Sequence, residues 1–240
     1  MTGLEARAAV VAESDGAGGT RFPVLRGGGP LALRATGGGR IHLVGAAAGP
    51  LHGDDLRLDC QVRPGAALRL RSAAAMLVLS GASRYDVAAE VAEDGLLDHR
   101  PEPVIVTRGA AHRAHARVRL RPGARLDWTE RVVLGRHGEE PGGHRSRLDV
   151  VRGGVPLLRH ELRLGPHEPH AGPAVLDDAR AVGLLLLAGP EYAAAPVPVH
   201  AEPGLAVTPL AGPGVLVTAL APDAAALDAL LARGRARAER

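Results

Sequence analysis

Apolar and polar residues alternate along short stretches of this chain, and turns rich in glycine and proline separate the stretches. The clearest alternation covers residues 56–62, which read Leu-Arg-Leu-Asp-Cys-Gln-Val. A Gly/Pro turn that ends in two aspartates, residues 49–55, precedes it, and the turn Arg-Pro-Gly-Ala at 63–66 follows it. Because side chains in a β-strand point to opposite faces with a period of two, this pattern predicts a half-buried strand between two turns.

The same pattern predicts further strands on both sides of this unit. They are expected at residues 4–12, 22–35 (interrupted by Gly27-Gly28-Gly29-Pro30), 40–44, 197–199, 205–207 and 215–220. Residues 181–188 are apolar throughout and are predicted to form a buried strand or a short helix. Residues 165–173 contain three prolines and two glycines, which predicts a loop.

One helix is predicted at the carboxyl end of the sequence. Pro222 and Asp223 precede it, and Leu227, Leu230 and Leu231 have the i, i+3, i+4 spacing of an apolar helix face. The arginine-rich residues 233–240 suit the negative pole of the helix dipole and are expected to fray.

A repeat of about 30 residues organises the middle of the chain. The marker glycines Gly65, Gly95, Gly123 and Gly153 are 30, 28 and 30 residues apart, and each lies between apolar alternating stretches. Self-similarity at this period is typical of stacked repeats. We therefore predict a mainly β protein with coiled or layered strands, β-helix-like repeats of about 30 residues and a C-terminal α-helix. The alternative is that Arg-Pro-Gly-Ala is merely a common hairpin turn.

Length and composition are compatible with one domain. A chain of 240 residues can bury a sizeable core, and we expect a single domain over residues 1–240. Its core would span residues 40–165, with C-terminal strands and the helix at 175–238. Aromatic residues make up only 2% of the sequence, so leucine, valine and alanine must build the core.

Composition also excludes several classes of protein. All 29 basic residues are arginine, the formal net charge is only +3, and few aromatic residues could stack on bases, which argues against a nucleic-acid-binding protein. The longest apolar run, residues 181–188, is far below the length of a membrane span. Cys60 is the only cysteine, which favours a reducing compartment. We expect a cytoplasmic protein with neither nucleic-acid nor membrane partners.

Histidines are the first candidates for metal binding. They form three loose pairs: His112 with His115, His137 with His144, and His167 with His170. None matches a zinc motif, and on a strand His112 and His115 would face opposite sides. Exposed polar histidines are the ordinary explanation for each pair, and a weak site that metal only passes would look the same.

Carboxylates beside apolar segments are the second candidates. They are Asp54, Asp55, Glu102, Glu130, Glu139 and Glu161. Two of them could form a glycosidase-like acid and base pair, but exposed turn or ion-pair residues are the simpler expectation. Asp54 could cap its own turn through the backbone.

Nucleophiles and nucleotide sites find no support in the sequence. No serine lies in a G-x-S-x-G motif, Cys60 in mid-strand is expected to be a buried structural thiol, and there is no phosphate-binding glycine loop between a strand and a helix. From the residues alone, the chain is a β scaffold with scattered acids and histidines, not an enzyme.

Several short motifs, taken in order, resemble the UreD (UreH) family of urease accessory proteins. The family's G-x-[VL]-x-G-D-x-L turn, strand and x-P-G-A turn correspond to Gly49–Leu56 and Arg63–Ala66. Further matches are Arg71–Ala75 with Ser80-Gly81, Pro101–Ile105 for P-E-x-x-I, Glu130 with Gly135-Arg136 and Gly138-Glu139, and Arg147–Val150 with Pro156–Leu158. The resemblance is good from about residue 40 to 165.

The resemblance implies a non-enzymatic chaperone for nickel insertion into urease. Such a protein would bind apo-urease on one side and the F-type accessory protein on the other, and the F-type protein recruits the G-type GTPase that brings nickel. No cofactor would be tightly bound; nickel would be in transit through an internal polar passage. Carried over by position, Asp54, Glu130 and His160 would line the passage, and Glu102 is added from its signature. His160 stands where the family usually has an acid.

Two other functions stay open at this point. A metal-dependent hydrolase on a β-solenoid would require two of Asp54, Glu102, Glu130 and His160 to converge in an open cleft. A plain protein-binding module would have no metal role at all. Replacing Asp54 and Glu130 by alanine would then leave urease activation unchanged.

Overall fold

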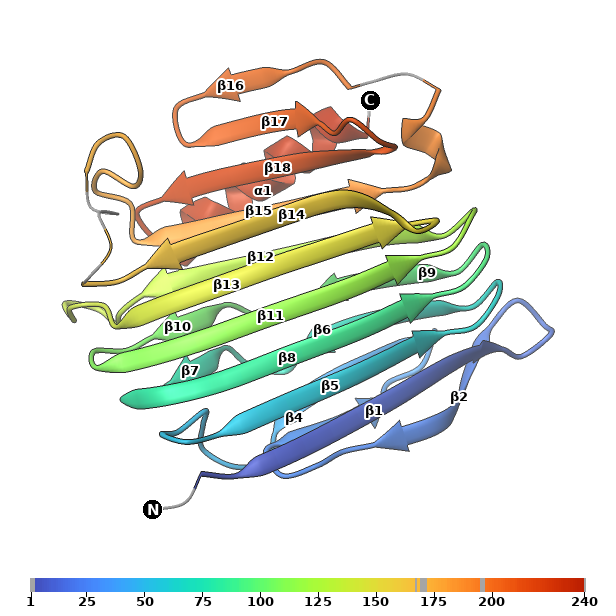
Figure 1. Ribbon diagram of the computed structural model, residues 1–240, viewed down its shortest axis with the longest axis horizontal. Coiled ribbons are helices and arrows are strands. Elements are labelled where there is room, and N and C mark those ends of the chain that lie inside the picture. The colour runs from blue at the N-terminus through green and yellow to red at the C-terminus, as the bar shows by residue number, and fades with distance from the viewer. Residues whose placement is uncertain (1–2, 167, 169–171, 195–196, 240) are drawn as a thin grey trace.

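The computed structural model describes residues 3–166, 168, 172–194 and 197–239, and these form two β-sheets and one α-helix (Figure 1). Sheet A has seven strands, in the spatial order β14 (Val155–Leu164), β13 (Gly143–Arg152), β11 (Ala110–Leu120), β8 (Gly81–Val91), β5 (Asp55–Val62), β1 (Glu5–Ser14) and β2 (Thr20–Arg26). Among the residues described, no helix is long and apolar enough to cross a membrane.

Sheet B has eleven strands. Nine follow the order β16 (His200–Glu202), β17 (Leu205–Pro209), β18 (Gly214–Ala221), β15 (Ala181–Ala188), β12 (Arg125–Leu134), β9 (Leu96–Arg100), β6 (Ala67–Ser72), β4 (Arg40–Gly45) and β3 (Leu31–Ala35). The short strands β10 (Val104–Val106) and β7 (Met76–Val78) extend β12 on one side. A 3-10 turn, η1 (Pro190–Tyr192), and the helix α1 (Ala224–Ala238) complete the fold.

The central strands of both sheets run parallel, and successive coils of the chain stack in register. In sheet A, Leu58 pairs with Val87 and Val87 with Ala116, so partner numbers differ by 29 (58, 87, 116). In sheet B the same offset joins Leu68 to Leu97. Each fully buried leucine of such a column stabilises the fold by about 1.5–3 kcal/mol. The predicted coiled β architecture is thereby confirmed, with a period of 29 residues.

The turns that connect the two sheets stack in the same register. Gly65 and Gly123 both adopt a left-handed conformation, with φ of 66° and 72°, and Asp94 takes the equivalent place between them with φ 54°. Aspartate tolerates this region better than most residues. The true repeat marker is therefore position 94 and not Gly95. The amide of Gly65 donates to the carbonyl of Glu93 in the next turn, at 3.0 Å.

The alternative that these turns are β-hairpins is wrong for the turn at Gly65 and correct only for the last turn, at Gly153. β5 and β6, on either side of Gly65, belong to different sheets, so their turn is a corner of the coil. The turn at Gly153, in contrast, joins β13 to β14, which are antiparallel neighbours. The coil therefore stops where a true hairpin lets the chain reverse.

The N-terminal predictions agree with the structure. The expected strand at 4–12 is β1, the interrupted stretch at 22–35 forms β2 and β3, and residues 40–44 lie in β4. β1 joins the coil out of sequence order, because it pairs in parallel with β5, and Ala8 lies beside Leu58. The N-terminal strand thus extends the same core.

The C-terminal segment continues sheet B with antiparallel strands. Residues 181–188 form a strand, β15, between β12 and β18, and all of its residues are buried. The strands expected at 205–207 and 215–220 are β17 and β18. The strand expected at 197–199 is wrong: these residues are irregular, and β16 begins at His200. The described residues of the 165–173 loop form no helix or strand, as expected.

Helix α1 packs on the outer face of sheet B (Figure 1). The Asp223 side chain caps it by accepting a hydrogen bond from the Ala226 amide at 2.8 Å, and Leu227 and Leu231 are buried beneath it. The prediction that the basic end of the helix frays is wrong, because α1 continues to Ala238. Arg235 donates to both carboxylate oxygens of Asp127 in β12 at 2.7 Å, which holds the last turn on the sheet.

Candidate functional site

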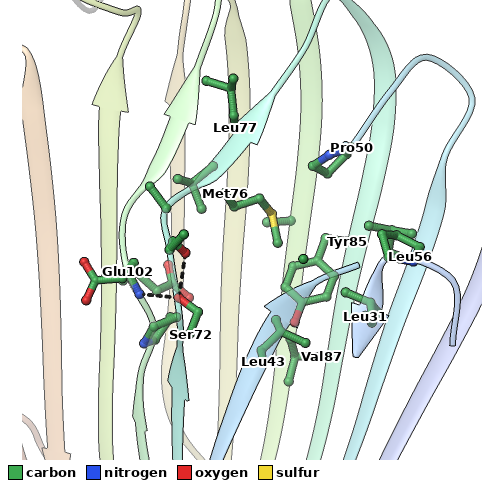
Figure 2. A pocket seen from close by; sticks show the side chains of 18 of the residues that line it. Leu31, Leu43, Pro50, Leu56, Ser72, Met76, Leu77, Tyr85, Val87 and Glu102 are labelled. Carbon is green, nitrogen blue, oxygen red and sulfur yellow. Dashed lines mark hydrogen bonds between the residues drawn. The ribbon is translucent and has the colours of Figure 1, made fainter. Parts of the chain in front are cut away.

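A cavity of about 430 Å³ lies between the two sheets and is the main candidate site (Figure 2). Its labelled lining residues are Leu31, Leu43, Pro50, Leu56, Ser72, Met76, Leu77, Tyr85, Val87 and Glu102. Most of this wall is apolar, and burial raises the pKa of the Tyr85 hydroxyl, so the phenol stays neutral. The few polar groups that border the cavity therefore determine its chemistry.

Glu130 is a half-buried carboxylate in the wall of this cavity. It lies on β12, on the face that points toward sheet A, and its Oε1 accepts a hydrogen bond from Trp128 Nε1 at 2.9 Å. Burial raises the pKa of Glu130, and the indole hydrogen bond opposes that shift only in part. Trp128 in turn stacks on His99, with 3.8 Å between ring centroids. The stack fixes the indole and, through it, the carboxyl group.

Two buried histidines lie side by side on the inner face of sheet A. His112 on β11 and His144 on β13 are register partners with ring centroids 5.5 Å apart, and only 1% and 4% of their surfaces are exposed. Ser83 Oγ lies 2.9 Å from His112 Nδ1. Burial lowers the pKa of His112 to about 4 and that of His144 to about 3, so both imidazoles are neutral at neutral pH.

The expectation of exposed histidines is thus wrong for His112 and His144. It fails because His112 and His144 occupy inward-facing, buried positions of their strands, β11 and β13. His115 does face the opposite side, as expected, and contacts Asp149 Oδ2 through Nε2 at 2.7 Å. His137 is exposed in a turn. His167 and His170 lie outside the described residues.

Asp54 occupies a structural position near the cavity. Its Oδ1 accepts a hydrogen bond from the Leu4 amide at 3.0 Å, and its Oδ2 accepts one from the Leu51 amide at 2.8 Å. The predicted capping of its own turn is confirmed, and the contact with Leu4 also fastens the start of β1. Asp54 is buried but is not among the residues that border the cavity.

Glu102 and His160 lie in two different environments. Glu102 follows β9 and borders the cavity, but its carboxylate is exposed and points away from Tyr85 in Figure 2. Its amide donates to Ser72 Oγ at 2.7 Å. His160 is half-buried on β14 beside Leu148, and burial lowers its pKa. It does not border the cavity.

The four residues singled out from the sequence therefore do not meet at one point. Glu130 and Glu102 border the same cavity, whereas Asp54 and His160 do not. Throughout the part of the chain that the structure describes, no three His, Cys, Asp or Glu side chains are placed to hold a metal ion together. This geometry lacks the convergent cleft that the hydrolase interpretation requires.

The other candidate acids are exposed or ion-paired, and the thiol is buried. Asp55 is exposed, Glu139 pairs with Arg136, which lowers its pKa to about 2, and Glu161 pairs with two arginines. Cys60 is a buried free thiol, and burial raises its pKa to about 12. It stays protonated and packs in the core, as expected.

The sequence interpretation missed the stacked inner residues, although a signal for them exists. At an offset of 29, position 99 falls on Trp128 and position 83 on His112, which are the pairs that the structure shows. His112 and His144 are 32 apart because the chain makes a longer excursion between β12 and β13. The repeat register, applied residue by residue, predicts most of these contacts.

A two-sheet coil with an apolar cavity and few inward polar groups defines a β scaffold. Comparison with known proteins gives its family. The family model described as UreD urease accessory protein matches residues 4–240. The chain belongs to the UreD urease accessory protein family, and this membership supports a role in urease maturation.

Curated relatives are similar to this protein over almost the whole chain. A urease accessory protein UreD from Streptomyces coelicolor is 46% identical, covering 95% of this chain and 94% of that protein. UreD 3 from Streptomyces griseus is 45% identical, covering 95% and 94%. UreD from Parafrankia sp. is 45% identical, covering 94% of this chain and 86% of that protein. These relatives are named as accessory proteins and not as enzymes.

Proposed function

We propose that this protein is a non-catalytic scaffold for urease maturation in the cytoplasm. It binds apo-urease and the F-type accessory protein, which recruits the G-type GTPase, and nickel passes through the scaffold on its way to urease. The observation that carries the proposal is the cavity between the sheets with a half-buried carboxylate, Glu130, in its wall, whose pKa is raised by desolvation. Family membership over residues 4–240 supports the accessory role.

The chemistry of the cavity suits an ion that passes and is not stored. Carboxylate oxygen and imidazole nitrogen are ligands that bind divalent first-row metals, including nickel. Glu130 is the best-placed ligand, with Glu102 at the same cavity, and Asp54 and His160 are the more remote candidate stations. Since no three such side chains in the described residues converge, each contact is expected to be weak, and a weakly held ion can move on.

Reconstitution of urease activation tests the proposal. The full chain, co-expressed with apo-urease and the F-type and G-type proteins, is expected to co-elute with them and to raise urease activity and bound nickel. Failure of the wild-type chain to associate with either urease or the F-type protein would refute the scaffold function.

Variants of Glu130 separate the nickel route from the scaffold. Glu130→Gln keeps the size of the side chain and an acceptor for Trp128 but loses the charge, so it is expected to lower activation about tenfold, as for loss of a ligand-supporting group, with partner binding intact. Glu90→Gln, an exposed acid paired with Arg119 at 3.1 Å, is the matched control. Wild-type activation by Glu130→Gln would exclude Glu130 from the route while leaving the scaffold function in place.

A further inference from the structure

Acidic and basic residues are distributed unevenly across the strand order of sheet A. β1 and β5 together carry four carboxylates and two arginines, whereas β11, β13 and β14 together carry two carboxylates and seven exposed arginines. In Figure 1 these strands form the front layer, and no other described element crosses them. One half of this uncovered face is therefore strongly basic.

One row of residues shows this separation most clearly. Across six neighbouring strands in register, the row reads Glu5, Asp55, Arg84, Arg113, Arg145 and Arg163. We call its four arginines the arginine row; all four are exposed. Because neighbouring strands lie about 4.8 Å apart, the arginine row extends over about 14 Å.

This row is unfavourable for the sheet by itself. Like charges directly opposite one another on neighbouring strands are destabilising. The next row along the same strands avoids this, because there Asp86, His115, Arg147 and Glu161 interleave acidic and basic groups. The sheet thus has the means to alternate charges and does not do so in the arginine row.

The arginine row is also only partly neutralised. Arg84 pairs with Asp86 at 2.5 Å, and Arg145 and Arg163 share Glu161, at 3.0 and 2.6 Å. Within the described part of the chain, the Arg113 side chain has neither an ion pair nor a hydrogen bond, although it sits at the centre of the row. The four guanidinium groups of the row therefore have only two carboxylates as ion-pair partners.

We propose that the arginine row is a docking surface for an acidic segment of a protein partner in urease maturation. Guanidinium groups bind carboxylates in a bidentate, planar geometry, and a row of exposed arginines across neighbouring strands fits a segment that lies over them. The acids Glu5 and Asp55 at the other end of the row would repel a long polyphosphate backbone, which favours a protein over a nucleic acid. The proposal rests on the scaffold function above.

The charge reversal Arg113→Glu tests the surface, and Arg7→Glu is its matched control. Arg7 is also exposed, lies on the same face of sheet A, on β1, and makes no ion pair among the described residues. Full-length wild type, both variants and Arg113→Lys are each measured against purified apo-urease and the purified F-type protein, by biolayer interferometry at about 50 and 300 mM salt.

Arg113→Glu is expected to weaken binding to one of these two partners about tenfold or more at low salt, with a smaller effect at high salt, because exposed charges are screened. Arg7→Glu should stay within about twofold of wild type, and Arg113→Lys should lie between the two. In the free protein, Arg113→Glu should raise Tm by about 1–3 °C, because it relieves repulsion between its neighbours. Weaker binding by a more stable protein excludes misfolding as the cause.

Two results would overturn the proposal. Equal binding of both partners by Arg113→Glu and Arg7→Glu would exclude this surface, and the scaffold function would stand if the wild type still binds. Binding of duplex or single-stranded nucleic acid by the wild type that is lost in Arg113→Glu, with protein binding unchanged, would assign the row to a different class of partner. If the wild type bound neither protein, the scaffold function itself would fail.

Discussion

The two faces of sheet A differ in chemistry at adjacent positions of the same strands. His112 and His144 point inward and are neutral, whereas Arg113 and Arg145, the next residues, point outward and are exposed and charged. A single step along a strand thus separates a buried basic side chain from an exposed one. The alternation of the strand thus buries histidines, which can be neutral, and leaves arginines, which stay charged, at the exposed surface.

Each face also contains polar or charged groups that lower the stability of the fold. On the inner face, His112 Nε2 and His144 Nδ1 are buried without a hydrogen-bond partner among the described residues, and an unpaired buried polar group costs about 1–3 kcal/mol. On the outer face, four arginines lie next to one another. The following predictions separate the energetics of the two faces.

The largest expected effect is the response of the inner face to acid. The unfolded histidine pKa is about 6.5, whereas burial lowers that of folded His112 to about 4 and of His144 to about 3. Below pH 6.5 the unfolded chain binds more protons, so stability is full above 6.5 and falls toward pH 4. At about 1.4 kcal/mol per pKa unit, the loss should be about 3 kcal/mol or more.

Urea unfolding at pH 7, 6, 5 and 4 measures this loss. The variant His144→Gln should show a weaker dependence of the unfolding free energy on pH.

The outer face responds to acid in a different pH range. Ion pairing with Arg147 lowers the pKa of Asp149 from 3.8 to about 2, so the stability from that carboxylate is lost only below about pH 4. Unchanged stability between pH 6.5 and 4.5 would contradict the burial of neutral histidines.

The second effect is a cavity on the inner face. Leu58→Ala should lower the free energy of unfolding by about 2–5 kcal/mol, because Leu58 is 0% exposed and packs in register with Ala8 and Val87. Chemical denaturation of the purified variant measures it. A loss below about 1 kcal/mol would show that the two sheets are not closely packed at this point.

A smaller effect is expected from the hydroxyl beside His112. Ser83→Ala leaves the buried Nδ1 of His112 without its partner at 2.9 Å, which should cost about 1–3 kcal/mol. Ser80→Ala, which removes only an exposed 3.4 Å contact with the Gly109 carbonyl, is the control, and differential scanning fluorimetry compares the two. Equal Tm values for both variants would argue against the Ser83 contact.

The smallest effect is expected on the outer face. Arg57→Ala removes an ion pair with Asp59 at 2.7 Å in which both side chains are more than 40% exposed. Exposed pairs contribute about 0–1 kcal/mol, so its unfolding free energy should lie within about 0.5 kcal/mol of wild type. Arg57 is the neighbour of Leu58, and the pair of variants measures both faces at one strand position. A loss comparable to that of Leu58→Ala would show that the outer face is not solvent-exposed.

Local features of the fold were predictable from the sequence. The strand at 56–62 alternates because one face is buried, the Arg-Pro-Gly-Ala turns carry the glycine that a left-handed corner requires, and Asp223 marks the start of the helix. The period near 30 followed from these turns, and it was uneven because Asp94, not Gly95, occupies the corner. Val197–Val199 failed as a strand because apolar character alone does not create a pairing partner.

The candidate site was predictable only in part. Glu130 and Glu102 do border the cavity, but nothing in the local sequence distinguished them from Asp54, whose carboxylate is occupied by two backbone amides. Proximity in sequence pairs His112 with His115 and His144 with His137. In the fold His112 and His144 are neighbours instead, because adjacent strands place residues 29 or 32 positions apart side by side.

The sequence by itself determined which residues alternate, where the chain turns and that a coil repeats, since these depend on a few neighbouring residues. Only the tertiary structure decided the exact offset, and with it that His99 stacks on Trp128, that two histidines lie side by side in the core and that four arginines line up outside. The physical reason is that strand register is set by the sum of many weak contacts between coils. A shift of one residue would exchange the two faces.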